Sequence, residues 1–322
     1  MGYPHERVEM TCRCRDSDVI PRVPNAGAIE SYRGQSVQVM HNGLRVATHG
    51  YYGEWVTDVI GRLRGCHEPQ EELAFWETVK RLPDAPTMLE LGAYWGYYTC
   101  WFLKDHPAGR AFCVEPDPNH MKVGQANLQL NDLRATFVNA GVGARPAAGR
   151  SFTCESDGAV RRLPIISVDS FVREHGIPYI DVLLADIQGA EYEMLQGALE
   201  TIAAGKVRFM LISTHHRSIC RYPLMHQVCL AKVRQLGGHV FAEHSIAESF
   251  SGDGLVAASF APEDRSLPAV PLSYNRASTN IYREPEYELA ALSTFPVAVR
   301  NVLRSGKRIL KGSMRRLGRV EQ

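Results

Sequence analysis

The chain has 322 residues, of which 45% are hydrophobic and 22% charged. This composition is typical of a globular protein with one large α/β domain or two modest ones. No run of eighteen apolar residues occurs, and the N-terminus lacks the apolar segment of a secretory signal, so we expect neither a transmembrane helix nor export. The sequence therefore predicts a cytoplasmic protein.

The net charge of +1 is unevenly distributed along the chain. Eight lysines and arginines and no acid lie between Val297 and Arg319, which leaves 28 basic and 35 acidic residues in the rest of the chain. A nucleic-acid partner needs a basic face, so we expect none for this acidic body. In the tail, apolar residues recur every three or four positions beside basic ones. This spacing predicts a basic C-terminal helix suited to peripheral contact with the inner membrane surface, with a solvated tail as the alternative.

Residues 1–83 are expected to form an N-terminal arm and a lid-like segment. Prolines and glycines interrupt the first 34 residues, which predicts an irregular arm. The alternating stretch 37–46 surrounds the pair Asn42-Gly43, a combination that favours a β-hairpin. Apolar spacing predicts helices over 55–60 and 69–82.

Residues 84–262 have a different pattern, in which short apolar runs alternate with amphipathic segments. We expect strands at 88–91, 111–114, 136–138, 182–185, 209–212, 239–243 and 255–260, with helices over 97–104, 120–130, 189–203 and 223–236. Such alternation predicts a doubly wound, mostly parallel sheet of the Rossmann-like α/β class. Residues 263–322 would form a C-terminal extension that ends in the basic helix.

The clearest local signal is the first strand of this pattern and the turn that follows it. Glu90 lies in the strand, and Gly92, Ala93, Tyr94 and Gly96 follow in the turn, which leads through Thr99 into a helix. Glycine allows both a sharp backbone turn and the close approach of a ligand. Glu115, nineteen residues after Gly96, ends the next strand, where a carboxylate can hold both hydroxyls of a ribose. These residues together predict a nucleoside-cofactor site.

The same loop does not fit a dinucleotide well. Its glycines are spaced Gly-x-x-x-Gly, whereas the dinucleotide fingerprint is Gly-x-Gly-x-x-Gly. The carboxylate of Glu90 would repel a pyrophosphate but attract the ammonium and sulfonium groups of S-adenosylmethionine. A nicotinamide-dependent dehydrogenase and a non-catalytic nucleoside-binding subunit remain as alternatives.

Two further blocks support a family resemblance. The first is Ser-Val-Asp-Ser-Phe at 167–171, and the second is Asp-Ile-Gln-Gly-Ala-Glu at 186–191, followed by Met-Leu-Gln-Gly-Ala at 194–198. From about 85 to 260 the chain resembles the FkbM family of S-adenosylmethionine-dependent methyltransferases, which act mainly on hydroxyls of glycans and secondary metabolites. The loop after the first strand also resembles that of catechol O-methyltransferase. Many FkbM members have a lysine two residues before the aspartate, where this chain has Leu184.

The resemblance implies a class I methyltransferase fold with a seven-stranded sheet whose last strand is antiparallel. It also implies which residues bind the cofactor. Glu115 would bind the ribose, Asn139 and Ala140 would lie near the adenine, and Asp186 would face the transferred methyl group. The methionine end would be surrounded by Glu90, Gly92, Ala93, Tyr94, Gly96 and Thr99. Ligands of open α/β sheets do bind outside the carboxyl ends of the strands.

The strand after that of Asp186 ends in two histidines, His215 and His216. An alcohol is a weak nucleophile until its proton is removed, and a neutral imidazole with a pKa near 6.5 can accept that proton. We therefore expect Asp186, His215 and His216 to be the catalytic residues. Alternatively, the same three side chains could bind a divalent metal such as Mn²⁺, Fe²⁺ or Zn²⁺, as carboxylate and imidazole ligands do.

The sequence thus predicts an S-adenosylmethionine-dependent O-methyltransferase. The resemblance implies an acceptor hydroxyl on a sugar of a glycan or glycolipid precursor, with a histidine as base near Asp186. The alternative is a metal-assisted O-methyltransferase of a small phenolic or polyketide metabolite, a secondary-metabolite acceptor to which the catechol-type loop points.

Overall fold

The computed structural model describes residues 4–48, 50–51, 53–276 and 279–282. Its main sheet has seven strands in the order β6 (Thr136–Val138), β5 (Arg110–Val114), β4 (Thr87–Leu91), β10 (Ile180–Ala185), β11 (Val207–Thr214), β13 (Gly254–Ser259) and β12 (His239–His244). All neighbouring strands are parallel except at β13, which is antiparallel to both β11 and β12. The seven-stranded, mostly parallel sheet with an antiparallel last strand is confirmed.

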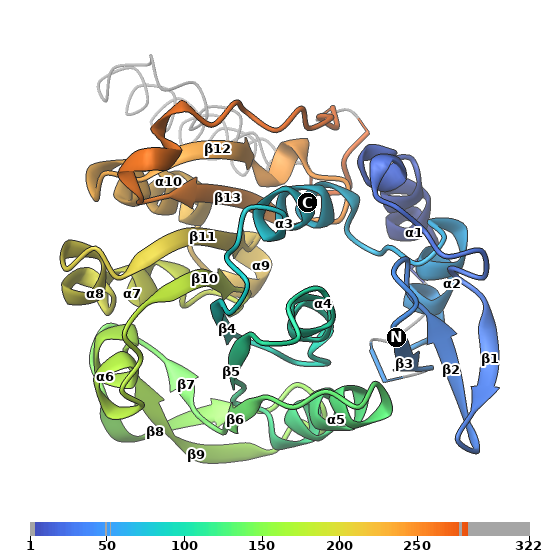
Figure 1. Ribbon diagram of the computed structural model, residues 1–322, viewed down its shortest axis with the longest axis horizontal. Helices are drawn as coiled ribbons and strands as arrows, with labels where there is room; N and C mark the ends of the chain where they lie inside the picture. Colours follow the sequence, from blue (N-terminus) through green and yellow to red (C-terminus); the bar gives the residue numbers. More distant parts are fainter. Residues whose placement is uncertain (1–3, 49, 52, 277–278, 283–322) are drawn as a thin grey trace, which may run out of the picture. The chain divides into compact units, whose positions relative to one another are not determined.

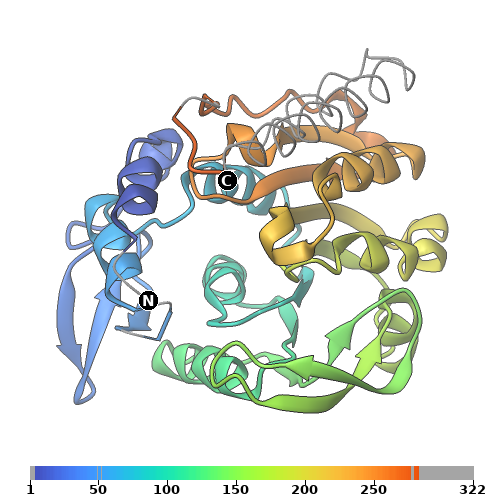
Figure 2. The ribbon, with the colours of Figure 1, turned by 180° about the vertical axis from the view of Figure 1, so that it is seen from behind.

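Helices cover both faces of this sheet, as Figures 1 and 2 show from opposite sides. One face carries α3 (Pro69–Val79), α4 (Tyr97–Asp105) and α5 (Pro118–Leu130), and the other carries α6 (Val168–Glu174), α7 (Glu191–Gln196), α8 (Leu199–Ala203) and α10 (Met225–Gln235). Successive side chains of a strand point to opposite faces. In β10, Val182 and Leu184 accordingly pack in the core of the first face, whereas Leu183 and Ala185 pack in that of the second. The doubly wound arrangement follows from strands that are apolar on both faces.

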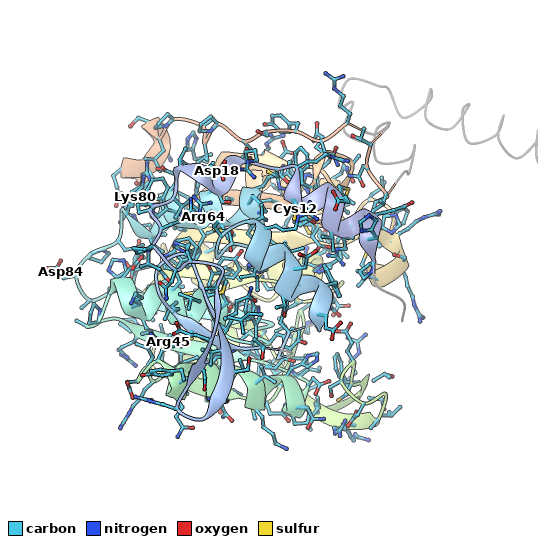
Figure 3. The ribbon with its side chains drawn as sticks, turned by 90° about the vertical axis from the view of Figure 1, so that its right-hand side faces the viewer. Cys12, Asp18, Arg45, Arg64, Lys80 and Asp84 are labelled. Carbon is cyan, nitrogen blue, oxygen red and sulfur yellow. The ribbon has the colours of Figure 1, made fainter. Side chains whose placement is uncertain are left out.

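The N-terminal segment contains more regular structure than the sequence predicts. The hairpin around Asn42-Gly43 is confirmed by β2 (Gln35–Val39) and β3 (Arg45–Ala47), and the two helices by α2 (Glu54–Arg62) and α3. The expectation of an irregular arm is wrong, because it contains α1 (His5–Cys12), η1 (Asp16–Val19) and β1 (Ile29–Tyr32), which extends the hairpin to three strands. In Figure 3, Cys12, Asp18 and Arg45 mark α1, η1 and β3 on one side of the molecule.

A second three-stranded sheet lies between β6 and α6 in the sequence. It consists of β7 (Gly141–Val142), β9 (Val160–Ile166) and β8 (Ala147–Thr153), in that spatial order. The antiparallel β8–β9 hairpin is not predicted from the sequence, because most of β8 is exposed and lacks an apolar face.

The helix expected over 189–203 is instead two short helices, α7 and α8. The break is at Gly197, where an added Cβ atom would lie 2.5 Å from the carbonyl oxygen of Gly143. This close approach requires glycine, so the tertiary contact overrides the helical pattern. The remaining short elements are α9 (Arg217–Cys220), η2 (Ile246–Glu248) and η3 (Pro262–Ser266).

The described residues belong to one compact unit, Met1–Arg283. No described helix has the length and apolarity needed to span a bilayer. The domain limits expected at residues 83 and 262 stay predictions. The basic helix expected between Val297 and Arg319 lies outside the described residues.

Candidate functional site

A cavity of about 460 Å³ lies beside the carboxyl ends of the central strands. Gly92 follows β4, Glu115 follows β5 and Asp186 follows β10, and all three line this cavity. Glu90, Ala93 and Tyr94 line it as well. The parallel strands thus bring six of the predicted site residues to one cavity, as expected for ligand sites in open α/β sheets.

The turn after β4 depends on Gly92. Its φ of +79° is in the left-handed region, and a Cβ atom there would lie 1.8 Å from the carbonyl oxygen of Asp186. The amide N–H of Gly92 donates to the carbonyl of Val114 at 2.8 Å. The turn therefore packs tightly against the ends of both neighbouring strands, which only glycine permits.

Glu90 points from β4 toward the start of α4. Its Oε2 atom accepts hydrogen bonds from the amide and the hydroxyl of Thr99. Burial raises the pKa of Glu90 to about 8, although the bonds from Thr99 oppose this shift. The negative charges of Asp186 and Glu115 raise the pKa of Glu90 further. A positively charged ligand in the cavity would favour ionised Glu90.

Glu115 is fixed by two backbone amides. Its Oε2 accepts from the amide of Tyr94 at 2.9 Å, and its Oε1 accepts from the amide of Asp117 at 2.8 Å. Burial raises the pKa of Glu115 to about 7 against the effect of these two bonds. Each carboxylate oxygen keeps a further lone pair, so the group can still accept two hydroxyl hydrogens from a ribose.

Asp186 is the cavity-facing end of a row of charged side chains. Its Oδ1 lies 3.0 Å from Nε2 of His215, and Nδ1 of the same imidazole lies 2.6 Å from Oε1 of Glu191. The side chain of Asp186 is 42% exposed, whereas that of His215 is 4% exposed and that of Glu191 is fully buried. His215 therefore lies behind Asp186 and does not line the cavity.

The surroundings of His215 favour its charged form. Burial by itself would lower the pKa of this imidazole, but Asp253, Glu191 and Asp186 raise it well above its ordinary value. Oδ1 of Asp253 lies 3.8 Å from Nε2 of His215, and Oδ2 lies 3.7 Å from Nη2 of Arg7 on α1. The raised pKa favours the imidazolium form of His215, whereas the sequence predicts a neutral imidazole that acts as the base.

His216 is directed to a different environment from its neighbour. Its Nδ1 accepts from the amide of Ser218 at 3.2 Å at the start of α9, and its ring lies 5.0 Å from that of Tyr282. Among the described residues, no group of three or more histidines, cysteines and acids is arranged to hold a metal ion. The alternative metal ligand set of Asp186, His215 and His216 is therefore not assembled in the part of the chain that the structure describes.

Four other predicted residues lie around the cavity but do not line it. Thr99 binds Glu90, and Gly96 faces α5, where a Cβ atom would lie 3.0 Å from Cδ1 of Leu128. Asn139 donates from Nδ2 to the carbonyls of Glu115 and Pro116 at 2.8 and 3.0 Å, and Ala140 is fully buried. Their contacts indicate positions that support the walls of the site.

The N-terminal segment adds wall residues that the motifs did not identify. His67 lies between Glu68 and Glu72, with Nε2 3.3 Å from Glu68 and Nδ1 2.9 Å from Glu72. Burial alone would lower the pKa of His67, but the two acids raise it to about 10. Tyr51, His67 and Glu68 line the cavity, and the ring of Tyr51 stacks on that of Trp95 at 4.4 Å.

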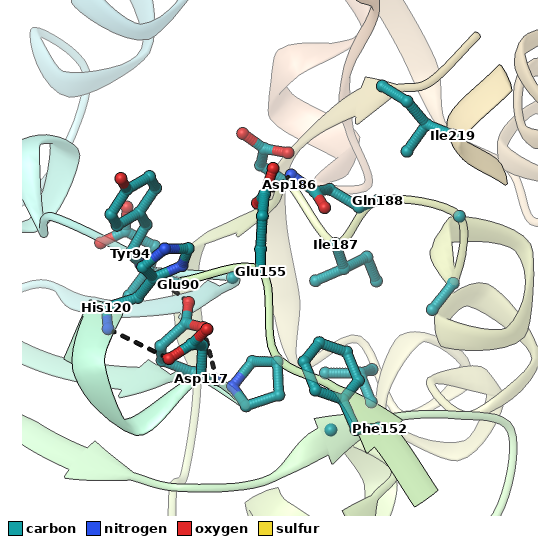
Figure 4. Close-up of a pocket in the computed structure, with 18 of the residues that line it drawn as sticks. Glu90, Tyr94, Asp117, His120, Phe152, Glu155, Asp186, Ile187, Gln188 and Ile219 are labelled. Carbon is teal, nitrogen blue, oxygen red and sulfur yellow. Dashed lines mark hydrogen bonds between the residues drawn. The ribbon is translucent and has the colours of Figure 1, made fainter. Parts of the chain in front are cut away.

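Residues after β5 and residues of the β8–β9 hairpin also line the cavity. Figure 4 shows Tyr94, His120, Asp117, Phe152 and Glu155 projecting toward the cavity around Glu90 and Asp186. The rings of Tyr94 and His120 stack with their centroids 3.8 Å apart. No sequence motif marks the hairpin residues, because the contacts that bring them to the site are tertiary.

Comparisons with known proteins show similarity to methyltransferases. Residues 90–228 match the family described as the methyltransferase FkbM domain. The 2-O-methyltransferase NoeI from Sinorhizobium fredii (strain NBRC 101917 / NGR234) is 25% identical over 175 residues, which cover 45% of this chain and 71% of NoeI.

Solved structures of low similarity also match. A precorrin-6y C5,15-methyltransferase from Geobacter metallireducens GS-15 has 14% identity and a TM-score of 0.38, over 58% of this chain and 87% of its own. A putative O-methyltransferase from Klebsiella pneumoniae has 19% identity and a TM-score of 0.36, over 58% and 78% respectively. The stretch that is similar to the methyltransferase FkbM domain, residues 90–228, thus contains Glu90, Glu115 and Asp186, the three acids at the strand ends that line the cavity.

Proposed function

We propose that this chain transfers a methyl group from S-adenosylmethionine to a hydroxyl of a sugar in a glycan or glycolipid precursor. The observation that carries the proposal is the group of Glu90, Glu115 and Asp186 around one cavity, with the pKa values of both glutamates raised by burial. Such a group favours a ligand with positive charges and ribose hydroxyls. The 2-O-methyltransferase among the relatives supports oxygen as the acceptor atom.

Bound S-adenosylmethionine would supply an electrophilic methyl group on a sulfonium, which is a good leaving group. The residues of the chain would bind it with Gly92 at the methionine end and Glu115 at the ribose. Glu90 would balance its positive charge, since it lies on the same wall as Gly92. The remaining step is removal of the proton from the acceptor hydroxyl.

We assign that step to the pair of Asp186 and His215. Asp186 faces the cavity, so its carboxylate would accept the hydroxyl proton while the new oxygen–methyl bond forms. His215 would act through Asp186: its Nε2–H, 3.0 Å away, orients the carboxylate, and Glu191 fixes the other end of the ring. General base catalysis of this kind contributes about 10²–10⁴ in rate.

The arrangement supports this assignment better than a metal-assisted reaction on a phenolic metabolite. Nε2 of His215 lies 3.0 Å from Oδ1 of Asp186, so His215 uses in this contact the nitrogen with which it would bind an ion shared with Asp186. His216 is turned toward α9. For all three side chains to bind one metal ion, His215 would have to release Asp186, and His216 would have to turn away from α9.

Methyl transfer from radiolabelled S-adenosylmethionine into fractionated extract of the source cell tests the proposal. Label in polysaccharide or glycolipid that disappears with Asp186→Asn supports it, whereas label in small phenolic metabolites supports the alternative. Tight binding of S-adenosylhomocysteine without methyl transfer to any fraction would indicate a non-catalytic subunit. Binding of NAD in preference to S-adenosylhomocysteine would contradict the cofactor itself.

A further inference from the structure

We use the name apolar slot for the part of the cavity that Phe152 and the apolar residues named with it line. Six of the lining residues are apolar and come from three parts of the chain: Pro116 after β5, Ile187 after β10, and Val142, Phe152, Leu163 and Ile165 from the small sheet. In Figure 4, Phe152 and Ile187 project toward the same part of the cavity, away from Tyr94 and His120. An apolar slot of this kind suits a flat aromatic ring.

The slot lies next to the carboxylate that would bind the ribose. Pro116 directly follows Glu115, and Asn139 ties the two together by donating to both of their carbonyls. A nucleoside whose ribose hydroxyls bind Glu115 would therefore extend its base toward Pro116 and the slot. Asn139 and Ala140, expected near the adenine, would act by holding this wall in place.

The tip of the β8–β9 hairpin, residues 154–157, is attached to the loop after β5. Asp117 accepts from the amide of Ser156 through Oδ2 at 2.9 Å and from its hydroxyl through Oδ1 at 2.8 Å. Oδ1 also caps α5 by accepting from the amide of Asn119 at 2.9 Å. Asp117 thus joins the hairpin tip to the wall that contains Glu115 and Pro116.

The hairpin tip also contacts the opposite wall. Nε2 of Gln188, in the turn after Asp186, donates to Oε2 of Glu155 at 3.4 Å. Nδ2 of Asn119 donates to Oδ2 of Asp157 at 3.3 Å on the α5 side. The tip therefore bridges the two sides of the slot.

We propose that the β8–β9 hairpin forms the outer wall of a purine subsite. Phe152 packs against the base. Asp117 is a positioning residue that keeps the hairpin tip closed over the base. The assignment rests on the proposed function, because it takes the ribose site at Glu115 as its anchor. It places specificity for the cofactor base on a segment that no sequence motif marks.

Binding of S-adenosylhomocysteine by titration calorimetry tests the role of Phe152. Phe152→Ala should weaken binding by at least about tenfold, because contact between a base and an aromatic ring is lost. Phe152→Tyr should restore most of the affinity. Val160→Ala, at a 68% exposed position of the same hairpin outside the cavity, is the matched control and should bind like the wild type.

The role of Asp117 is tested by the dissociation rate of S-adenosylhomocysteine in stopped-flow experiments. Asp117→Asn can still cap α5, since asparagine is as good an N-cap as aspartate, but it presents a donor where Ser156 needs an acceptor. Dissociation should become about tenfold faster, with a melting temperature close to that of the wild type. An unchanged rate in this variant would overturn the positioning role.

The failures of the two proposals are distinguishable. If folded Phe152→Ala binds S-adenosylhomocysteine as tightly as the wild type does, the purine subsite is wrong but the proposed function stands. If the wild-type protein does not bind S-adenosylhomocysteine, the proposed function fails, and the subsite fails with it.

Discussion

The Nε2 atom of His215 lies 3.0 Å from Oδ1 of Asp186, while the adjacent His216 caps α9 with its Nδ1. Two neighbouring histidines therefore have different surroundings, and His215 is the one that lies against Asp186, an acid that lines the cavity. This difference allows one to serve as a control for the other.

We expect His215→Ala to lower the turnover number by at least about tenfold, because Asp186 loses the group that orients it. The affinity for S-adenosylhomocysteine should stay nearly unchanged, which calorimetry can verify. His216→Ala should keep most of the turnover. Since His215→Ala also leaves the buried Glu191 without its imidazole partner, His215→Gln provides a second variant that retains a donor. Full turnover in both His215 variants would rule out this role.

Chelation should not abolish the activity. If Asp186 accepts the proton directly, dialysis against EDTA leaves turnover intact, because the reaction then needs no bound ion. The measurement compares dialysed protein with protein supplied with Mn²⁺. Loss of activity on dialysis and recovery with Mn²⁺ would instead favour the metal-assisted alternative.

The stability of the ligand-free protein should fall as the pH rises from 6 to 9. The pKa values of Glu115 and Glu90 are raised from 4.5 to about 7 and about 8, so folding favours their protonated forms. This contribution is fully present below pH 4.5 and is lost as the pH passes through 7 and 8. Thermal unfolding across this range should show a decrease that Glu90→Gln makes smaller. A melting temperature that rises between pH 6 and 9 would contradict the assigned direction.

The affinity for S-adenosylhomocysteine should change with pH in the opposite direction. Its ammonium group favours ionised carboxylates, so binding should strengthen between pH 6 and 9 by at most about tenfold per pH unit for each proton released. Glu115→Gln should weaken binding at pH 8 by about 10- to 100-fold, as expected when a charged hydrogen-bond acceptor is lost. A variant with wild-type affinity and an unaltered pH profile would remove Glu115 from the site.

Gly92→Ala should destabilise the fold far more than Gly34→Ala. Both glycines have a φ of +79°, but an added Cβ at Gly34 meets no atom within 4 Å, whereas at Gly92 it would lie 1.8 Å from the carbonyl oxygen of Asp186. Gly34→Ala therefore carries only the conformational cost, about 1–2 kcal/mol. Urea unfolding of both variants measures the difference, and equal losses would show that the turn can relax.

The basic tail should bind anionic surfaces if the sequence-based proposal for residues 297–322 is right. Each lysine or arginine near such a surface contributes about 1 kcal/mol, and salt screens the attraction. The full chain should therefore co-sediment with phosphatidylserine liposomes at low salt, and a chain lacking these residues should not. Equal sedimentation of the two proteins would assign the tail another role.

The sequence by itself determined the fold class and predicted a group of residues that the fold brings to one cavity. The strands of the central sheet are continuous apolar runs, and the turn at Gly92 and the acid at Glu115 lie at fixed distances along one strand–helix–strand unit. Such signals are local, so periodicity and spacing are sufficient to predict them. Of the six predicted residues that line the cavity, Glu90 lies inside β4, and the other five lie within three residues after the end of β4, β5 or β10.

Only the tertiary structure decided which charges surround His215 and raise its pKa, and that the β8–β9 hairpin lines the cavity. Asp253 and Arg7 are separated in the sequence by more than two hundred residues and meet near His215 because α1 packs against the loop before β13. The β8–β9 hairpin is exposed and has no periodic apolar face, so nothing in its pattern marks it as part of the site. A pKa depends on which charges surround a buried group, and the chain brings these charges together only when it folds.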